Sequence, residues 1–184
     1  MRRRQPAADR PRWHAVVTAV SCALLAIGVV VGIWFAAAPE QVERVVGEAK
    51  VNVEKATVAV QKQAGKAVGA DVHPTVRLGP LGHRSELNWC DGRFIQMREY
   101  QIRDVLPVYA AHNDCGGDII LRWEVGDIVR ISGRDELYEV VDERHTPKWA
   151  EVKSLRGMTG ELLLQTCFYG QDKMRFLALQ PVQT

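Results

Sequence analysis

The residues with the clearest chemical use are Cys167 and Arg175. Cys167 ends the largely apolar segment 163–167, and Arg175 lies eight residues later in a second apolar segment, 174–182. The short turn 169–172 between them predicts a hairpin that sets Cys167 opposite Arg175 on antiparallel strands. A cation beside a thiol favours the thiolate, and it can stabilise the oxyanion that forms when the thiolate attacks a carbonyl. With a histidine nearby, these groups would form a cysteine acyl-transfer site.

His112 is the candidate partner for the thiol. It ends the apolar segment 107–111 and opens the polar turn 113–117, so the strand would fix its position while its side chain reaches a cleft. The alternative is a structural histidine at a strand end. The other histidines after the N-terminal region lie in linker sequence or after a charged run: His73, His83 and His145. Histidines and acids show no metal-ligand spacing, so neither a metal nor another cofactor is expected.

The N-terminal region predicts a membrane anchor. Arginines crowd residues 1–14, which we interpret as a basic cytoplasmic tail, and residues 15–38 form a 24-residue stretch without a charged side chain. About 20 apolar residues cross a bilayer, and the arginines predict a single pass with the N-terminus in the cytoplasm and the rest of the chain outside. A signal peptide cleaved near the small residues 36–38 is the alternative. Both interpretations export the C-terminal part.

Export affects how the cysteines are interpreted. Cys22 lies in the predicted span, which leaves Cys90, Cys115 and Cys167 outside, where disulfides form and persist. Pairing Cys90 with Cys115 leaves Cys167 as a free and reactive thiol. The alternative leaves Cys115 reduced beside His112.

Three segments follow the predicted span. Residues 39–69 place small apolar residues at helical spacing, which predicts a stalk helix; a weak self-association seam is the alternative. Residues 70–84 contain Pro74, Pro80 and two glycines, Gly79 and Gly82, and are expected to be a linker. Residues 85–184 form the predicted catalytic domain.

Short strands are predicted throughout the C-terminal domain, with turn signals about every ten residues. This pattern indicates an all-β fold, a small barrel or sandwich. The predicted strands cover residues 93–98, 105–111, 118–123, 127–132, 136–142, 161–167 and 174–182. The longest connection, 146–160, would shape a substrate groove.

Several motifs together resemble the sortase family, the membrane-anchored cysteine transpeptidases of Gram-positive bacteria. They occur in the family's order and spacing and are Ala111-His112, Gly126-Asp127-Ile128-Val129, Tyr138-Glu139-Val140, Leu163-Leu164-Gln165-Thr166-Cys167 and Arg175. The resemblance covers roughly residues 90–182. It implies a closed barrel of about eight strands, with His112, Cys167 and Arg175 as the catalytic groups and Thr166 as a substrate-binding residue before the nucleophile. The chain departs from the family pattern at Leu163, where the family has threonine, and at Ala111, where many members have glycine.

The resemblance implies a specific reaction. Cys167 would cleave a sorting-signal peptide of a surface protein through a thioester and pass it to an amine, such as a cell-wall precursor or a pilin lysine. A cysteine hydrolase with the same residues, or a non-catalytic surface-binding module, are the alternatives. The net charge of +2 is too small to indicate a nucleic-acid partner.

Overall fold

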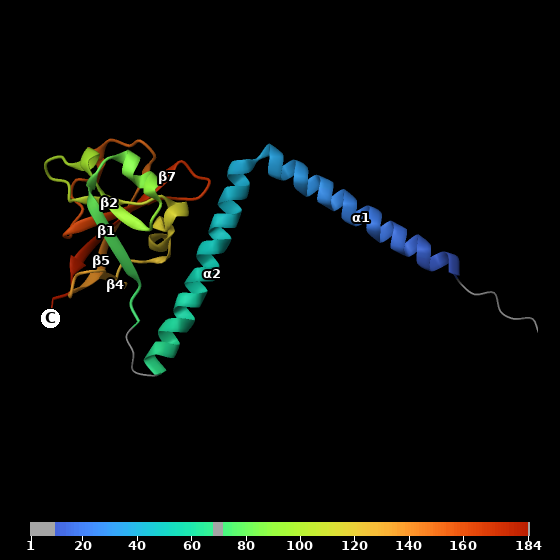
Figure 1. Cartoon of the computed structure of the whole chain (residues 1–184), viewed down its shortest axis with the longest axis horizontal. Coiled ribbons are helices and arrows are strands. Elements are labelled where there is room, and N and C mark those ends of the chain that lie inside the picture. Colours follow the sequence, from blue (N-terminus) through green and yellow to red (C-terminus); the bar gives the residue numbers. More distant parts are fainter. Residues whose placement is uncertain (1–9, 68–71, 184) are drawn as a thin grey trace, which may run out of the picture. The chain divides into compact units, whose positions relative to one another are not determined.

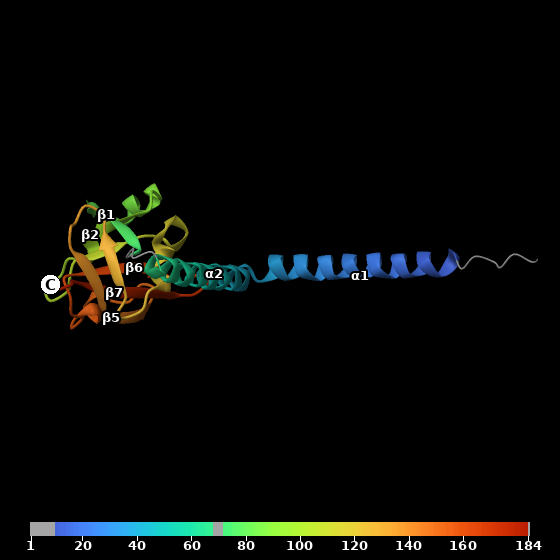
Figure 2. The same ribbon diagram turned by 90° about the horizontal axis from the view of Figure 1, so that it is seen from below.

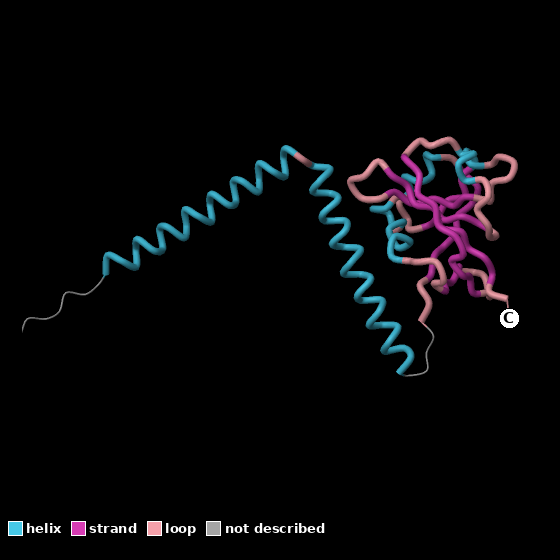
Figure 3. Tube along the Cα trace, turned by 180° about the vertical axis from the view of Figure 1, so that it is seen from behind, coloured by secondary structure: helices cyan, strands magenta, loops and turns pink. Residues whose placement is uncertain are grey.

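The computed structural model describes residues 10–67 and 72–183. Residues 1–42 and 43–184 form two separate compact units. The first contains helix α1 (Arg10–Ala37), and helix α2 (Pro39–Ala67) begins at its end (Figure 1). Strands are confined to the C-terminal part of the chain, whereas the N-terminal part is helical (Figure 3).

Helix α1 has the length and composition to cross a membrane. Its segment Val16–Ile33 has a mean hydropathy of 2.6, and none of that segment is buried. Ala38 interrupts the helix, and α2 begins at Pro39. Proline suits the first position of a helix, where its missing N–H has no partner to lose. One helix of this kind is a candidate anchor by length and composition.

Seven strands in the described part of the chain form one sheet. They are β1 (Thr75–Gly82), β2 (Arg93–Met97), β3 (Val108–Ala110), β4 (Ile128–Ile131), β5 (Leu137–Pro147), β6 (Leu162–Cys167) and β7 (Lys173–Pro181). Their order is β1-β2-β3-β6-β7-β5-β4, and β1 also pairs with β4, so the sheet closes on itself. The neighbours β6, β7 and β5 can be followed in Figure 2. The β-rich fold agrees with the sequence prediction, with seven strands in place of about eight.

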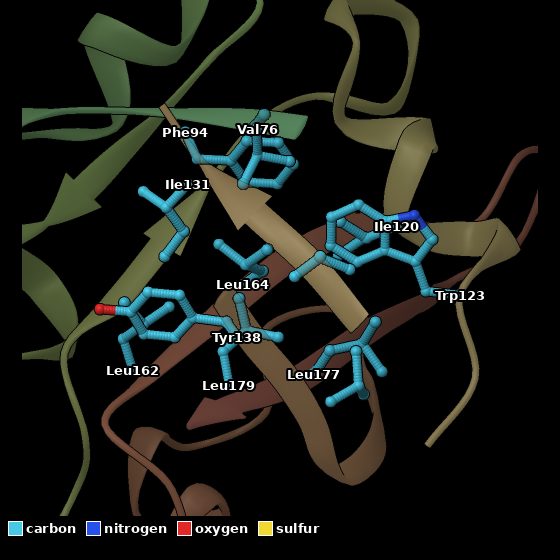
Figure 4. Packing of buried hydrophobic residues seen from close by; sticks show 13 residues of the cluster. Val76, Phe94, Ile120, Trp123, Ile131, Tyr138, Leu162, Leu164, Leu177 and Leu179 are labelled. Atoms are coloured by element: carbon cyan, nitrogen blue, oxygen red, sulfur yellow. The ribbon is translucent and has the colours of Figure 1, made fainter. Parts of the chain in front are cut away.

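Alternation along β6 and β7 divides their side chains between two apolar clusters. Leu162 and Leu164 lie in the barrel interior with Leu177 and Leu179 of β7 (Figure 4). The residues between them, such as Leu163, point the other way into a second cluster. That cluster also contains Val108, Leu155, Met158, Met174, Phe176 and Ala178. Because both faces are covered, the two strands are almost continuously apolar, and only the alternation tells which face a residue occupies.

Strand β1 corrects the prediction that residues 70–84 are a linker. Thr75–Gly82 pairs in parallel with β2, and its register shifts between Leu78 and Leu81. Gly79 lies so close to Ile95 that an added Cβ would come within 2.6 Å of the isoleucine Cδ1. Pro80, Gly79 and Gly82, which indicated a linker, thus belong to an irregular strand, in which the missing side chain of Gly79 permits close packing.

A 3₁₀ helix, η4 (Gly117–Arg122), corrects a second prediction, since residues 118–123 were expected to be a strand. The apolar residues Ile120 and Leu121 are buried, as a strand would also have buried them. A short apolar run does not distinguish the two structures by its periodicity. The other 3₁₀ helices described are η1 (Arg84–Trp89), η2 (Arg98–Tyr100), η3 (Asn113–Cys115) and η5 (Val152–Leu155).

Helix α2 contacts the strand domain through a row of residues on one face. Gly47 is buried against the ring of Tyr169, where an added Cβ would collide with the ring carbons. Lys50 forms a 2.5 Å ion pair with Asp118. One turn further on, Glu54 pairs with Arg122 at 3.0 Å. The spacing of three and four residues places all three contacts on one side of the helix. This face of α2 is therefore occupied within the chain, whereas Val46, Val53 and Val60 of the small-residue stripe are exposed.

Candidate active site

Cys167 is the last residue of β6 and has a half-buried, free thiol. It lies opposite Met174 of β7 and packs against the second apolar cluster. Gln165, two residues earlier, points to the same face, and its amide nitrogen Nε2 is 3.9 Å from the sulfur. The thiol thus stands at the end of a buried strand, where the strand fixes its position.

Strand β3 brings His112 to the same edge of the sheet. β3 pairs in parallel with β6, with Ala110 beside Gln165. The ladder continues one step further, because the Ala111 N–H donates to the Gln165 carbonyl at 3.1 Å. Continuing this register sets His112 beside Cys167, and neighbouring strands lie about 5 Å apart. The two predicted groups therefore come together.

The side chain of Thr166, expected to bind substrate, does not face the cavity that Cys167 lines. Its side chain is fully buried on the opposite face from Cys167, and its hydroxyl donates a 3.0 Å hydrogen bond to the Ala111 carbonyl. It therefore ties the strand of the thiol to the residue before His112. A direct substrate contact by this side chain is not supported, and we interpret Thr166 as a positioning residue.

The loop after His112 is held by a glycine and a disulfide. A Cβ on Gly117 would lie 2.6 Å from the Ala111 and His112 carbonyl oxygens and the Thr166 hydroxyl, so only glycine fits. Cys115, at the end of η3, forms a disulfide with Cys90 across 25 residues of sequence. A cross-link of this kind stabilises a fold by about 2–4 kcal/mol. Both features restrict the loop that begins at His112.

A cavity of about 470 Å³ lies in front of these groups. Its apolar lining includes Leu87, Met97, Tyr100, Ala111, Trp149, Ala150, Val152, Phe168 and Met174, and its polar lining includes Cys167, His112, Asn113, Gln165, Glu43, Arg84, Glu99 and Lys148. The connection 146–160 contributes four of these residues: Lys148, Trp149, Ala150 and Val152. No group of three His, Cys, Asp or Glu side chains suited to a metal ion occurs among the described residues.

Arg175 does not face Cys167, which corrects the predicted pairing across the hairpin. The register pairs Thr166 with Arg175 and Cys167 with Met174. Because side chains alternate along a strand, a shift of one residue transfers a side chain to the other face of the sheet. Arg175 therefore points to the face opposite the thiol.

The guanidinium of Arg175 is occupied by buried partners. Its Nε and one terminal nitrogen donate to both carboxylate oxygens of Glu143 at 3.0 and 2.7 Å. Its terminal nitrogens also donate to the carbonyls of Ile120 and Trp123 at 2.9 and 2.7 Å. Burial raises the pKa of Glu143, but the hydrogen bonds and charge of Arg175 outweigh it and leave that pKa below its ordinary value. Arg175 thus links β5, β7 and the end of η4.

Lys148 is a charged residue of the cavity that the sequence analysis missed. It follows Pro147, the last residue of β5, and lines the cavity together with Cys167. Burial raises the pKa of the Cys167 thiol above its ordinary value, while the charge of Lys148 acts to lower it. A single lysine in a loop after a proline carries no motif, so only the fold could reveal its proximity to the thiol.

Tyr169 connects the loops on either side of the cavity to helix α2. Its hydroxyl lies 3.0 Å from the Asn113 carbonyl, next to His112, and 2.9 Å from the carboxylate of Asp118. Burial and the hydrogen bond to Asp118 raise the pKa of Tyr169 to about 12, so the phenol is neutral. Lys50 supplies the positive charge that balances the buried Asp118. The turn after Cys167 and the loop after His112 therefore share one anchor.

Comparison with known proteins gives a likeness of fold. No protein-family model matches the chain, and no curated protein matches its sequence. Sortase A of Listeria monocytogenes is similar in structure, with 15% identity over 58% of this chain and 77% of that one, at a TM-score of 0.40.

Two further solved structures are similar. Sortase C1 of Streptococcus agalactiae, in complex with MTSET, shares 13% identity over 58% of this chain and 61% of that one, with a TM-score of 0.43. Sortase C of Clostridium perfringens, with the C-terminal cell wall sorting motif, shares 18% identity over 56% of this chain and 62% of that one, with a TM-score of 0.38. At these identities and scores the likeness concerns the fold alone.

Proposed function

We propose that this chain is a sortase-type cysteine transpeptidase. The observation that carries the proposal is the position of Cys167 and His112 at adjoining strand ends, lining one cavity. A free thiol and an imidazole in contact with one cleft are the nucleophile and the acid–base group that acyl transfer needs. The motif resemblance favours the same reaction.

In the proposed reaction, the sulfur of Cys167 attacks a backbone carbonyl carbon of the substrate, and the carbonyl electron pair moves to oxygen. As the tetrahedral intermediate collapses, the carbon–nitrogen bond breaks and His112 gives its proton to the departing amine. A thioester remains on Cys167. An incoming amine then attacks this thioester, gives its proton to His112 and releases Cys167 as the thiolate that began the reaction.

The cavity lining supports a peptide substrate. Its apolar side chains, such as Met97 and Val152, suit an apolar residue of a peptide, while Arg84, Glu99 and Lys148 offer polar contacts at its margin. We propose sorting-signal-bearing surface proteins as donors, and a cell-wall precursor or a pilin lysine as the amine acceptor. We also propose that α1 anchors the protein in the cell membrane, with the N-terminus in the cytoplasm and the catalytic domain outside.

The test uses the full-length protein in detergent micelles. It is incubated with a library of sorting-signal-like peptides, with and without amine acceptors, and its intact mass is measured. We expect a peptide adduct that is absent from Cys167→Ala and retained in Cys22→Ala, whose lost thiol lies in α1, far along the chain from the cavity. With an amine present, the peptide should appear on the amine.

Other outcomes separate the alternatives. An adduct that water releases equally fast with and without amines identifies a hydrolase. No adduct with any peptide, together with a Cys167 thiol of ordinary reactivity, contradicts the proposal and favours a binding module.

A further inference from the structure

A half-buried thiol reacts faster when a nearby cation favours its thiolate. Burial disfavours the thiolate of Cys167, and Arg175 is engaged with Glu143 on the other face of the sheet. The positive charge must therefore come from another residue that faces the cavity. Besides His112, the cations that line it are Arg84 and Lys148.

Arg84 is engaged elsewhere. Its guanidinium carbon lies 4.3 Å from the centre of the Trp149 ring, in a cation–π contact, and its backbone N–H donates to Glu99. The charge of Lys148, by contrast, acts directly on the Cys167 thiol and favours its thiolate. This arrangement leaves Lys148 as the cation available to the thiol.

The backbone of Lys148 is fixed close to the hairpin that carries Cys167. Pro147 pairs with Lys173 at the end of the β5–β7 ladder, and the Lys148 N–H donates to the Asp172 carbonyl at 3.2 Å. Met174, the residue opposite Cys167, lies two positions beyond Asp172. The half-buried side chain of Lys148 forms no ion pair or hydrogen bond with any residue in the described parts of the chain. The backbone of Lys148 is thus fixed at the cavity that it shares with Cys167, and its ammonium group is unpaired among the described residues.

We propose that Lys148, and not Arg175, supplies the positive charge that stabilises the Cys167 thiolate. Lys148 acts on the sulfur by charge alone, and no proton passes through it. Asp114 and Asp172 oppose it, and His112, Arg84, Glu43, Glu99 and Tyr100 are the other titratable groups that line the cavity. The inference rests on the proposed use of Cys167 as a nucleophile, but it concerns thiol reactivity, which can be measured without a substrate.

The test follows alkylation of Cys167 by iodoacetamide as a function of pH in the full-length protein, with the modified peptide identified by mass. The thiolate is the reacting species, so loss of the positive charge should raise the apparent pKa of the alkylation profile. We expect Lys148→Met to slow the reaction about 3–10-fold near neutral pH, with the rates converging at high pH. Lys148→Arg should restore most of the rate.

Negatively charged iodoacetate provides a second readout. The ratio of its rate to that of iodoacetamide should fall in Lys148→Met, because the cation that attracts the anion is gone. Lys153→Met is the matched control, since Lys153 pairs with Glu151 at the surface, and its profile should equal that of the unmodified protein.

An unchanged pH profile and rate ratio in Lys148→Met, with circular dichroism unaltered, would overturn the inference. If peptide adducts still form in that case, the proposed function stands without it. If the profile shifts as expected but no peptide reacts, the proposed function fails while the role of Lys148 remains.

Discussion

Replacing Arg175 with methionine should lower the free energy of unfolding by about 3 kcal/mol and the melting temperature by roughly 10 °C. The physical reason is that the change leaves the backbone carbonyls of Ile120 and Trp123 without their donor. It also leaves the Glu143 carboxylate with His145 in place of its bidentate partner. Thermal unfolding of the full-length protein, followed by circular dichroism, measures the effect. Below the transition, the folded variant should still transfer peptide from its thioester.

Arg93→Met is the control for this prediction. Arg93 pairs with Asp91, and both side chains are more than a third exposed, so its loss should cost less than about 1 kcal/mol. The interpretation of Arg175 would be wrong if Arg175→Met kept its melting temperature and lost only turnover. That result would indicate that the guanidinium of Arg175 takes part in the reaction.

Replacing His112 with glutamine should reduce peptide transfer by about 10²–10⁴-fold, the usual contribution of a general acid–base group. The departing amine then has no proton donor at the end of β3. The rate of thioester formation, measured by quenched-flow mass spectrometry, is the relevant quantity. The fold should persist, since the described contacts of His112 involve its backbone carbonyl.

A change of leaving group distinguishes acid catalysis from a positional effect. With a peptide ester whose alcohol leaves without protonation, most of the deficit of His112→Gln should disappear. His73→Gln, a change ahead of β1 and outside the cavity lining, should match the unmodified protein with both substrates. An equal deficit with both substrates would contradict the acid role.

Much of the strand pattern could be predicted because alternation and turn signals agree. Strands β4, β6 and β7 lie within one residue of their expected limits, whereas β5 continues to Pro147, beyond its expected end at residue 142. The cavity brings together the two groups chosen for their chemistry, Cys167 and His112. Strand β1 was missed because its proline and its two glycines are breaker signals in isolation. Its close approach to Ile95 is a tertiary requirement that no local pattern contains.

The misplaced Arg175 has a different cause. The turn 169–172 has four residues, so Phe168 meets Lys173, as the hydrogen bond between them shows, and Cys167 meets Met174. Pairing Cys167 with Arg175 needs an odd number of residues between the strands. The even number of turn residues could therefore have been counted in the sequence, and it already excluded the pairing of Cys167 with Arg175. The nearness of Lys148 to the thiol depends on how β5 ends against the hairpin, so no local sequence pattern predicts it.

The ion pair of Lys50 with Asp118 determines where the chain can be cut to obtain a membrane-free domain. A version that starts at β1 loses Lys50 and Gly47, and it leaves a carboxylate that is 5% exposed without its cation and the Tyr169 ring without its cover. A version that starts near Glu43 keeps both contacts and still removes the apolar segment Val16–Ile33. Helix α2 is thus part of the smallest piece that preserves the surroundings of the thiol.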